Sequence, residues 1–168
     1  MDGLKFVKHT REYLDYIEEH LLNVQQAWKN IQTACSDMFF IRDKSYFQKL
    51  NIEIINHDLS KFSEHEFTQY RQHFYPIGNE DRNMQEAWEH HISKNTHHWE
   101  NWTKLMEFGN YNYTVDLVHM VVDWVAMSYK FKNPPQQYYE QNKDTIILPK
   151  DAETLMLKIF ALLNSTEE

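Results

Sequence analysis

The chain has 168 residues, a formal net charge of −8 at pH 7, and few turn-forming residues, with three glycines and four prolines. This length fits one domain (residues 1–168) with its own hydrophobic core, and the scarcity of glycine and proline argues against a β-rich fold and for an all-α fold. The acidic charge argues against general nucleic-acid binding, and the single Cys35 excludes an intramolecular disulfide. Without a signal peptide or the ~20 consecutive apolar residues of a membrane span, we expect a cytoplasmic protein with no membrane association.

Apolar residues at helical spacing divide the chain into a series of helices. The first is predicted from about residue 4 to 34, and the second from an Asp43 cap to about Lys61. Ser63 and Glu66 form a capping-box pattern for a third helix. Further helices are predicted around residues 84–95 and 99–106, from about 113 to 131, and from about 151 to 163.

His57 and Asp58 stand at the end of the second predicted helix, after an apolar run. Helical phase would place His57 on the face that carries Ile54 and Lys61, with Asp58 beside it. Burying an imidazole and a carboxylate together requires a partner, and a divalent cation supplies one. The alternative is a hydrogen-bonded helix end that binds no ligand, with Lys61 as a solvated side chain.

Two further residues lie at the edges of predicted core faces. His20 lies beside the apolar stripe of the first helix, and Asp123 interrupts the most apolar helix of the chain. An unpaired aspartate there would be costly or protonated, whereas metal ligation removes the penalty. Neutral histidine with ionised aspartate suits Mn²⁺, Fe, Co²⁺, Ni²⁺ or Zn²⁺, one ion or two. There are two alternatives. Asp123 could be a core residue held by hydrogen bonds within the protein, or His119 could be a metal ligand in place of His20.

A second histidine cluster consists of the pairs at 90–91 and 97–98. His91 follows Ala87 by four residues, so helical phase predicts that it faces inward more than His90. By the same rule His98, four residues before Trp102, is predicted as the inward member of its pair. Either could be a ligand of a second ion. The alternatives are an exposed polar turn and a segment that lines the substrate entrance.

The order His20, His57–Asp58, Asp123 resembles the H…HD…D signature of the HD-domain metal-dependent phosphohydrolase superfamily. The resemblance implies an HD-like helical bundle of six to eight helices in which these four residues bind the metal. The chain is also similar to a group of small bacterial and phage proteins with HDLSKF and HHxxxxxHHW segments, a match that implies no activity. Some HD nucleotidases carry a glutamate after the HD pair where this chain has Lys61, so a glutamate-assisted mechanism is not implied.

The resemblance implies hydrolysis of a nucleotide or a related phosphate ester by a metal-bound hydroxide. Asp58 and Lys61 would be the catalytic residues, with Lys61 countering phosphate charge. The expected partner is a small phosphorylated ligand. The sequence does not decide whether the chain forms a homodimer. Two alternatives remain: a catalytically silent helical protein that binds a nucleotide or a partner protein, and a di-iron oxygenase on the same fold.

Overall fold

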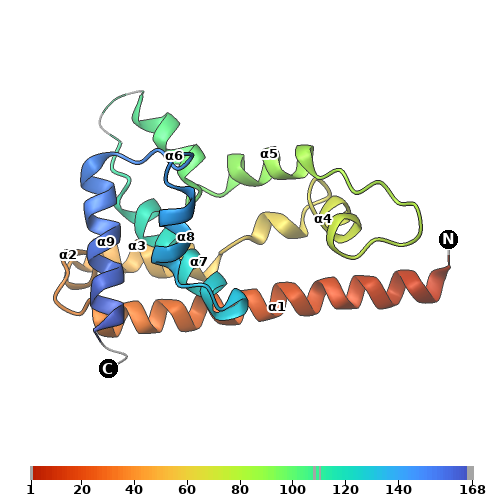
Figure 1. The fold of residues 1–168 in the computed structure, drawn as a ribbon, viewed down its shortest axis with the longest axis horizontal. Coiled ribbons are helices and arrows are strands. Elements are labelled where there is room, and N and C mark those ends of the chain that lie inside the picture. Colours follow the sequence, from red (N-terminus) through yellow and green to blue (C-terminus); the bar gives the residue numbers. More distant parts are fainter. Residues whose placement is uncertain (1, 108, 110, 166–168) are drawn as a thin grey trace. The chain divides into compact units, whose positions relative to one another are not determined.

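The computed structural model describes residues 2–107, 109 and 111–165. Over those residues the chain forms nine α-helices and one short 3₁₀ helix, and no strand (Figure 1). The all-α prediction is confirmed. The helices outnumber the six to eight expected, because α2 (Phe39–Arg42) and α8 (Pro135–Asn142) are too short to give a clear apolar period. None of the helices in the described ranges is long and apolar enough to cross a lipid bilayer.

The remaining elements follow one another along the chain with short connections. They are α1 (Gly3–Ala34), α3 (Lys44–Ile55), the 3₁₀ helix η1 (Leu59–Phe62), α4 (Phe67–Phe74), α5 (Gln85–Lys94), α6 (Trp99–Met106), α7 (Thr114–Phe131) and α9 (Lys150–Asn164).

The chain divides into two compact units, each built from two separate stretches of sequence. The first unit takes in the chain up to Leu21 and Asp58–Asn95; the second takes in Leu22–His57 and the chain from Thr96 onward. One boundary therefore falls within α1, and another falls between the consecutive residues His57 and Asp58. The expectation of one domain over residues 1–168 stays a prediction.

Helix α7 organises the second unit. It contacts α3, α6, α8 and α9, and Figure 1 draws α8 next to it with α9 to their left. Its apolar run is buried on almost every face, which is typical of a helix enclosed by others. The core around it also includes Trp28, Phe40, Leu50, Met156 and Phe160.

The first unit has a smaller and more aromatic core. Tyr13 and Ile17 of α1 pack with Tyr70 of α4 and Ala87 of α5. The ring of Tyr13 lies edge-on to Phe67, with centroids 5.2 Å apart. Helix η1 contacts both α4 and α5, so the segment that begins at Asp58 is held against this core.

The second predicted helix ends earlier than expected. α3 stops at Ile55, and its cap Asn56 donates its side-chain amide to the Ile52 carbonyl at 2.8 Å. Asp58 then adopts a left-handed backbone conformation, with φ of 56°, which cannot continue a right-handed helix. The prediction that His57, Asp58 and Lys61 lie on one continuous helix is wrong; the pair lies in the turn between α3 and η1.

Of the two predicted caps, one is confirmed. The Asp43 side chain accepts hydrogen bonds from the backbone amides of Ser45 and Tyr46, as an N-cap does. The capping box of Ser63 and Glu66 is wrong: α4 begins at Phe67, and Glu66 makes no side-chain capping bond. Its carboxylate is hydrogen-bonded to histidines instead.

Candidate metal centre

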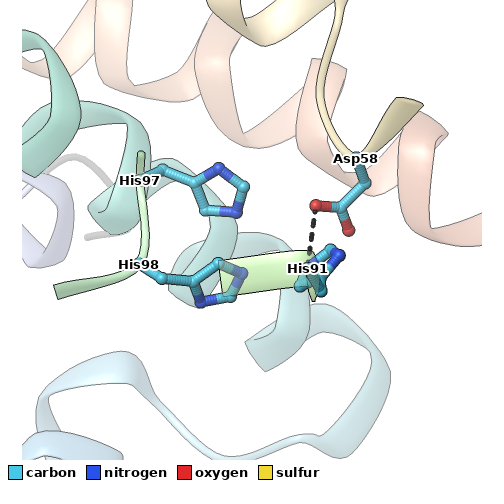
Figure 2. Close-up of side chains that lie close together, drawn as sticks. All are labelled: Asp58, His91, His97 and His98. Atoms are coloured by element: carbon cyan, nitrogen blue, oxygen red, sulfur yellow. Dashed lines mark ion pairs between the residues drawn. The ribbon is translucent and has the colours of Figure 1, made fainter. Parts of the chain in front are cut away.

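Asp58 is the centre of a buried polar cluster in the first unit. Its carboxylate lies 3.6 Å from Nε2 of His20 and 3.4 Å from Nε2 of His91. Lys61 donates from Nζ to Asp58 Oδ2 at 2.5 Å. Figure 2 shows the ring of His91 beside the carboxylate, joined to it by a dashed line. All but Lys61 are at least nine-tenths buried.

The spacing of these groups fits shared ligation of an ion. Direct N–H···O hydrogen bonds measure about 2.7–3.2 Å. Two ligand atoms that each bind one tetrahedral ion at about 2.0–2.2 Å lie roughly 3.3–3.6 Å apart. The distance from Asp58 Oδ2 to His20 Nε2, 3.6 Å, and the distance from Asp58 Oδ1 to His91 Nε2, 3.4 Å, each fall in the second range. Asp58 and His91 belong to one of the groups of His and Asp side chains whose ligand atoms lie within 4.8 Å of one another and that could hold a metal ion.

Glu66 fixes the orientation of His91. Its carboxylate lies 2.9 Å from Nδ1 of His91 and 2.7 Å from Nδ1 of His90, and it is fully buried. Burial alone would raise the pKa of Glu66, but hydrogen bonds from His91, His90 and Ser60 outweigh it and lower the pKa. An ionised carboxylate only accepts hydrogen bonds, so both Nδ1 atoms donate. Nε2 of His91 then carries the lone pair that a cation can use, as in carboxylate–histidine–metal triads.

A second histidine cluster lies in the second unit. His57, His97 and His119 are buried, and one ring nitrogen of each lies within 4.8 Å of the others. Nδ1 of His57 is 2.9 Å from Nε2 of His119, so one of these atoms donates to the other. Asp123 Oδ1 lies 3.7 Å from His57 Nε2. These imidazoles form a second donor set for a metal ion.

A hydrogen-bonded aspartate holds the start of the segment that carries His97. Thr96 donates to Asp116 Oδ1 at 2.5 Å, and Tyr111 donates to Asp116 Oδ2 at 2.8 Å. Burial raises the pKa of Asp116, and the two hydrogen bonds oppose the rise only in part. Because Asp116 stands in the first turn of α7, this network ties the chain just before His97 to that helix.

The predicted ligands divide between the two units. His20, Asp58, Lys61 and His91 belong to the first unit, and His57, His98 and Asp123 to the second. A single site that joins His20, His57, Asp58 and Asp123 therefore stays a prediction.

The two histidines of each pair differ in burial. His91 faces inward as predicted. The prediction that His98 is the inward member of its pair is wrong, because His97 is buried and His98 is only partly buried; His98 as a metal ligand stays a prediction. His98 is the N-cap of α6 and has extended backbone, so helical phase counted back from Trp102 does not apply to it. Figure 2 draws these two rings, which lie 4.4 Å apart between centroids.

Sequence reasoning missed Glu66, because its position three residues after Ser63 matched a capping box. It also missed two tyrosines. The hydroxyls of Tyr13 and Tyr70 are buried and have no hydrogen-bond partner among the described residues. Each such hydroxyl costs about 1–3 kcal/mol of stability. Aromatic residues at helical spacing predict packing and give no signal of a hydroxyl left without a partner.

The chain belongs to DUF5662, a family of unknown function, whose model matches residues 9–165. A comparison with curated proteins gave no match, and a comparison with solved structures gave none either. The family match covers both histidine clusters and carries no activity with it.

Proposed function

We propose that the protein is a metal-dependent phosphohydrolase that acts on a nucleotide or a related phosphate ester. The observation that carries the proposal is the Asp58 carboxylate, buried and surrounded by two imidazoles and an ammonium group. A buried aspartate of this kind needs cationic partners, and imidazole with carboxylate is a donor set for Mn²⁺, Fe, Co²⁺, Ni²⁺ or Zn²⁺.

Each residue of the first unit has a role in this proposal. Asp58, His20 and His91 would hold the ion, and Glu66 keeps Nε2 of His91 directed at it. A divalent ion in such a site polarises a phosphoryl oxygen and lowers the pKa of bound water to about 7. Lys61 adds positive charge beside Asp58, which favours an anionic substrate in a chain whose net charge is negative.

The second donor set supports two ions per chain. His57, His97 and His119 offer three imidazole nitrogens, and Asp123 lies next to His57. In the HD-like form of the proposal, one ion is bound by His20, His57, Asp58 and Asp123 together. The order of these residues in the sequence supports it.

Metal content tests the proposal directly. The untagged protein and its Asp58→Asn variant are purified and their metal is measured by inductively coupled plasma mass spectrometry. Asparagine tolerates the left-handed conformation of residue 58, so this change removes the charge with little backbone strain. We expect about one or two ions per wild-type chain and at least a tenfold weaker retention in the variant, because a ligand charge is lost.

The control is Asp37→Asn, which neutralises a carboxylate that is 97% exposed. Its metal content should equal that of the wild type. Equal metal in wild type and Asp58→Asn would contradict the proposal. A screen of nucleotides and cyclic nucleotides with Mn²⁺ or Co²⁺ then addresses the substrate. Tight nucleotide retention without turnover would favour a binding protein over an enzyme.

One observation favours a second candidate, the di-iron oxygenase. The cluster of His57, His97 and His119 supplies nitrogen donors alone, and imidazole suits iron as well as zinc. Iron-loaded protein that shows a charge-transfer absorption band in air and no phosphatase turnover would support this alternative.

A further inference from the structure

Two tyrosine hydroxyls in the first unit are buried without a hydrogen-bond partner among the residues that the structure describes. Tyr13 comes from α1 and Tyr70 from α4, and the two side chains share one small core. Tyr13 is 1% exposed and Tyr70 is 4% exposed, so bulk water does not satisfy either hydroxyl. A buried donor without an acceptor is destabilising, and its retention calls for a ligand that the donor binds.

Tyr70 lies beside the Asp58 cluster, and Tyr13 shares its core and lies close enough to feel the charges of Asp58 and Glu66. The ring of Tyr70 is edge-on to His91, with centroids 5.8 Å apart, and Lys61 Nζ lies 5.9 Å from the centre of the same ring. Both of those residues contact Asp58. The ring of Tyr13 packs edge-on to Phe67, three residues before Tyr70 on α4. Packing thus holds the two rings, and neither hydroxyl has a hydrogen-bond partner among the described residues.

The electrostatic surroundings keep both hydroxyls protonated. Burial raises the pKa of Tyr13 and of Tyr70, and the charges of Glu66 and Asp58 raise both further. A phenol that stays protonated is a neutral donor. These two carboxylates would repel an anion by themselves, so an anion can bind here only when cations offset them. Lys61 is one such cation, and the proposed metal ion is the other.

We propose that Tyr13 and Tyr70 donate hydrogen bonds to the oxygens of a terminal phosphate group bound at the Asp58 cluster. This inference rests on the proposed function and names its substrate class, a phosphate monoester. Two hydroxyls and the Lys61 ammonium match the three non-bridging oxygens of a terminal phosphate. A phosphodiester offers only two such oxygens, so two of these donors would have to share one oxygen.

The test measures binding of inorganic phosphate to Mn²⁺-loaded protein by isothermal titration calorimetry. The variants are Tyr13→Phe and Tyr70→Phe, which remove only the hydroxyl. We expect each to weaken phosphate binding about tenfold or more, the loss for one hydrogen bond to a charged group. Metal content should stay at the wild-type value, and the melting temperature should not fall, because neither hydroxyl has a partner in the part of the chain that the structure describes.

The matched control is Tyr139→Phe. The Tyr139 hydroxyl donates to Glu153 at 2.7 Å in the second unit, so its removal should lower the melting temperature and leave phosphate binding unchanged. If Tyr13→Phe and Tyr70→Phe each change phosphate affinity by less than about twofold, the hydroxyls do not bind phosphate and the inference is overturned. A lower melting temperature with unchanged phosphate affinity would assign them a structural role and overturn it as well.

Competition against phosphate tests the substrate class. A nucleoside 5′-monophosphate should displace inorganic phosphate, and a cyclic nucleotide should do so at least about tenfold less well. Equal competition would overturn the assignment of a terminal phosphate. The proposed function and this inference can be overturned separately. Metal-free wild-type protein would overturn the proposed function and this inference together, whereas metal-loaded protein that binds no phosphate would overturn the inference alone.

Discussion

The orientation of the imidazoles in the first unit depends on Glu66. Its two carboxylate oxygens accept from different rings, His90 through one oxygen and His91 through the other. Each ring therefore donates from Nδ1 and keeps its Nε2 as an acceptor. For His91 that atom faces Asp58. Groups of this kind, which touch the ligand and not the ion, commonly change metal affinity 10–100-fold when they are mutated.

We expect Glu66→Gln to lower metal affinity by about 10–100-fold. A glutamine side chain has one acceptor oxygen and one donor amide, so it can accept from only one of the two Nδ1 atoms. The ring that loses its acceptor must change tautomer or rotate. Competition with a chromophoric chelator measures the affinity. The neighbouring Glu64→Gln, at a carboxylate that is 91% exposed, is the control and should behave as wild type.

The stability of the same variant should depend on pH in a defined direction. Because the folded protein holds the pKa of Glu66 below 4.5, ionised Glu66 stabilises the fold above that pH, and this contribution is lost as the pH falls below it. The difference in unfolding free energy between wild type and Glu66→Gln should therefore be largest near neutral pH and shrink below about pH 4.5. A constant difference across this range would contradict the assignment.

The sequence predicts correctly whether a side chain faces the core only where that side chain lies within a regular helix. Helical phase places His91 inward because His91 and Ala87 lie within one regular helix, α5. It fails for His98 and Asp58, which lie just outside regular helices. A left-handed aspartate leaves no periodic signal, so the turn that presents Asp58 could not be predicted. The metal-ligating residue types could be recognised, but their grouping into clusters depends on these irregular segments.

Among the elements, α4 is anchored by an ion pair that the apolar pattern does not reveal. Arg71 is buried and donates to both carboxylate oxygens of Glu80, at 2.5 and 2.8 Å. Glu80 also accepts from the backbone amide of Ile77. The Arg71 guanidinium lowers the pKa of Glu80 to about 2. The loop after α4, which leads to the helix of His91, is therefore fixed to α4.

Glu80→Gln should destabilise the protein by about 3–5 kcal/mol at pH 7, because it leaves the Arg71 charge buried without its partner. Urea unfolding measures this loss. Since the pKa of Glu80 is lowered from 4.5 to about 2, the contribution of the pair is complete above pH 4.5 and is lost as the pH falls toward 2. The exposed Glu86→Gln is the matched control; a loss of similar size there would show that the ion pair is not responsible.

Long helices could be predicted closely, and the four-residue helix α2 could not be predicted. Helices α1, α7 and α9 begin and end within one residue of the predicted bounds, because each carries several turns of apolar residues. The four residues of α2 make little more than one turn, which is too short for a period. The second predicted helix ends near Lys61, whereas α3 stops at Ile55. The predicted end is too late because apolar residues continue to Leu59.

At the scale of the whole chain, neither the two compact units nor their boundaries could be predicted. A boundary inside α1 lies within an unbroken helical pattern, so local sequence does not mark it. The division between His57 and Asp58 separates two adjacent residues of one motif. Contacts between distant segments determine these units, and single-sequence periodicity does not report such contacts.

Metal binding should stabilise the whole chain, because the ligand residues are brought together only in the folded state. At a metal concentration 100 times the dissociation constant, linkage predicts about 2.7 kcal/mol, or a rise in melting temperature of roughly 5–10 °C for a chain of this size. Differential scanning fluorimetry with Mn²⁺ or Zn²⁺ measures the rise, and a chelator should reverse it. The rise should diminish as the pH falls, because protons compete with metal for the imidazole nitrogens. Asp58→Asn should lose the part of the rise that comes from the ion at the Asp58 cluster, and Asp37→Asn should keep all of it. Equal shifts in the two variants would place the bound metal elsewhere.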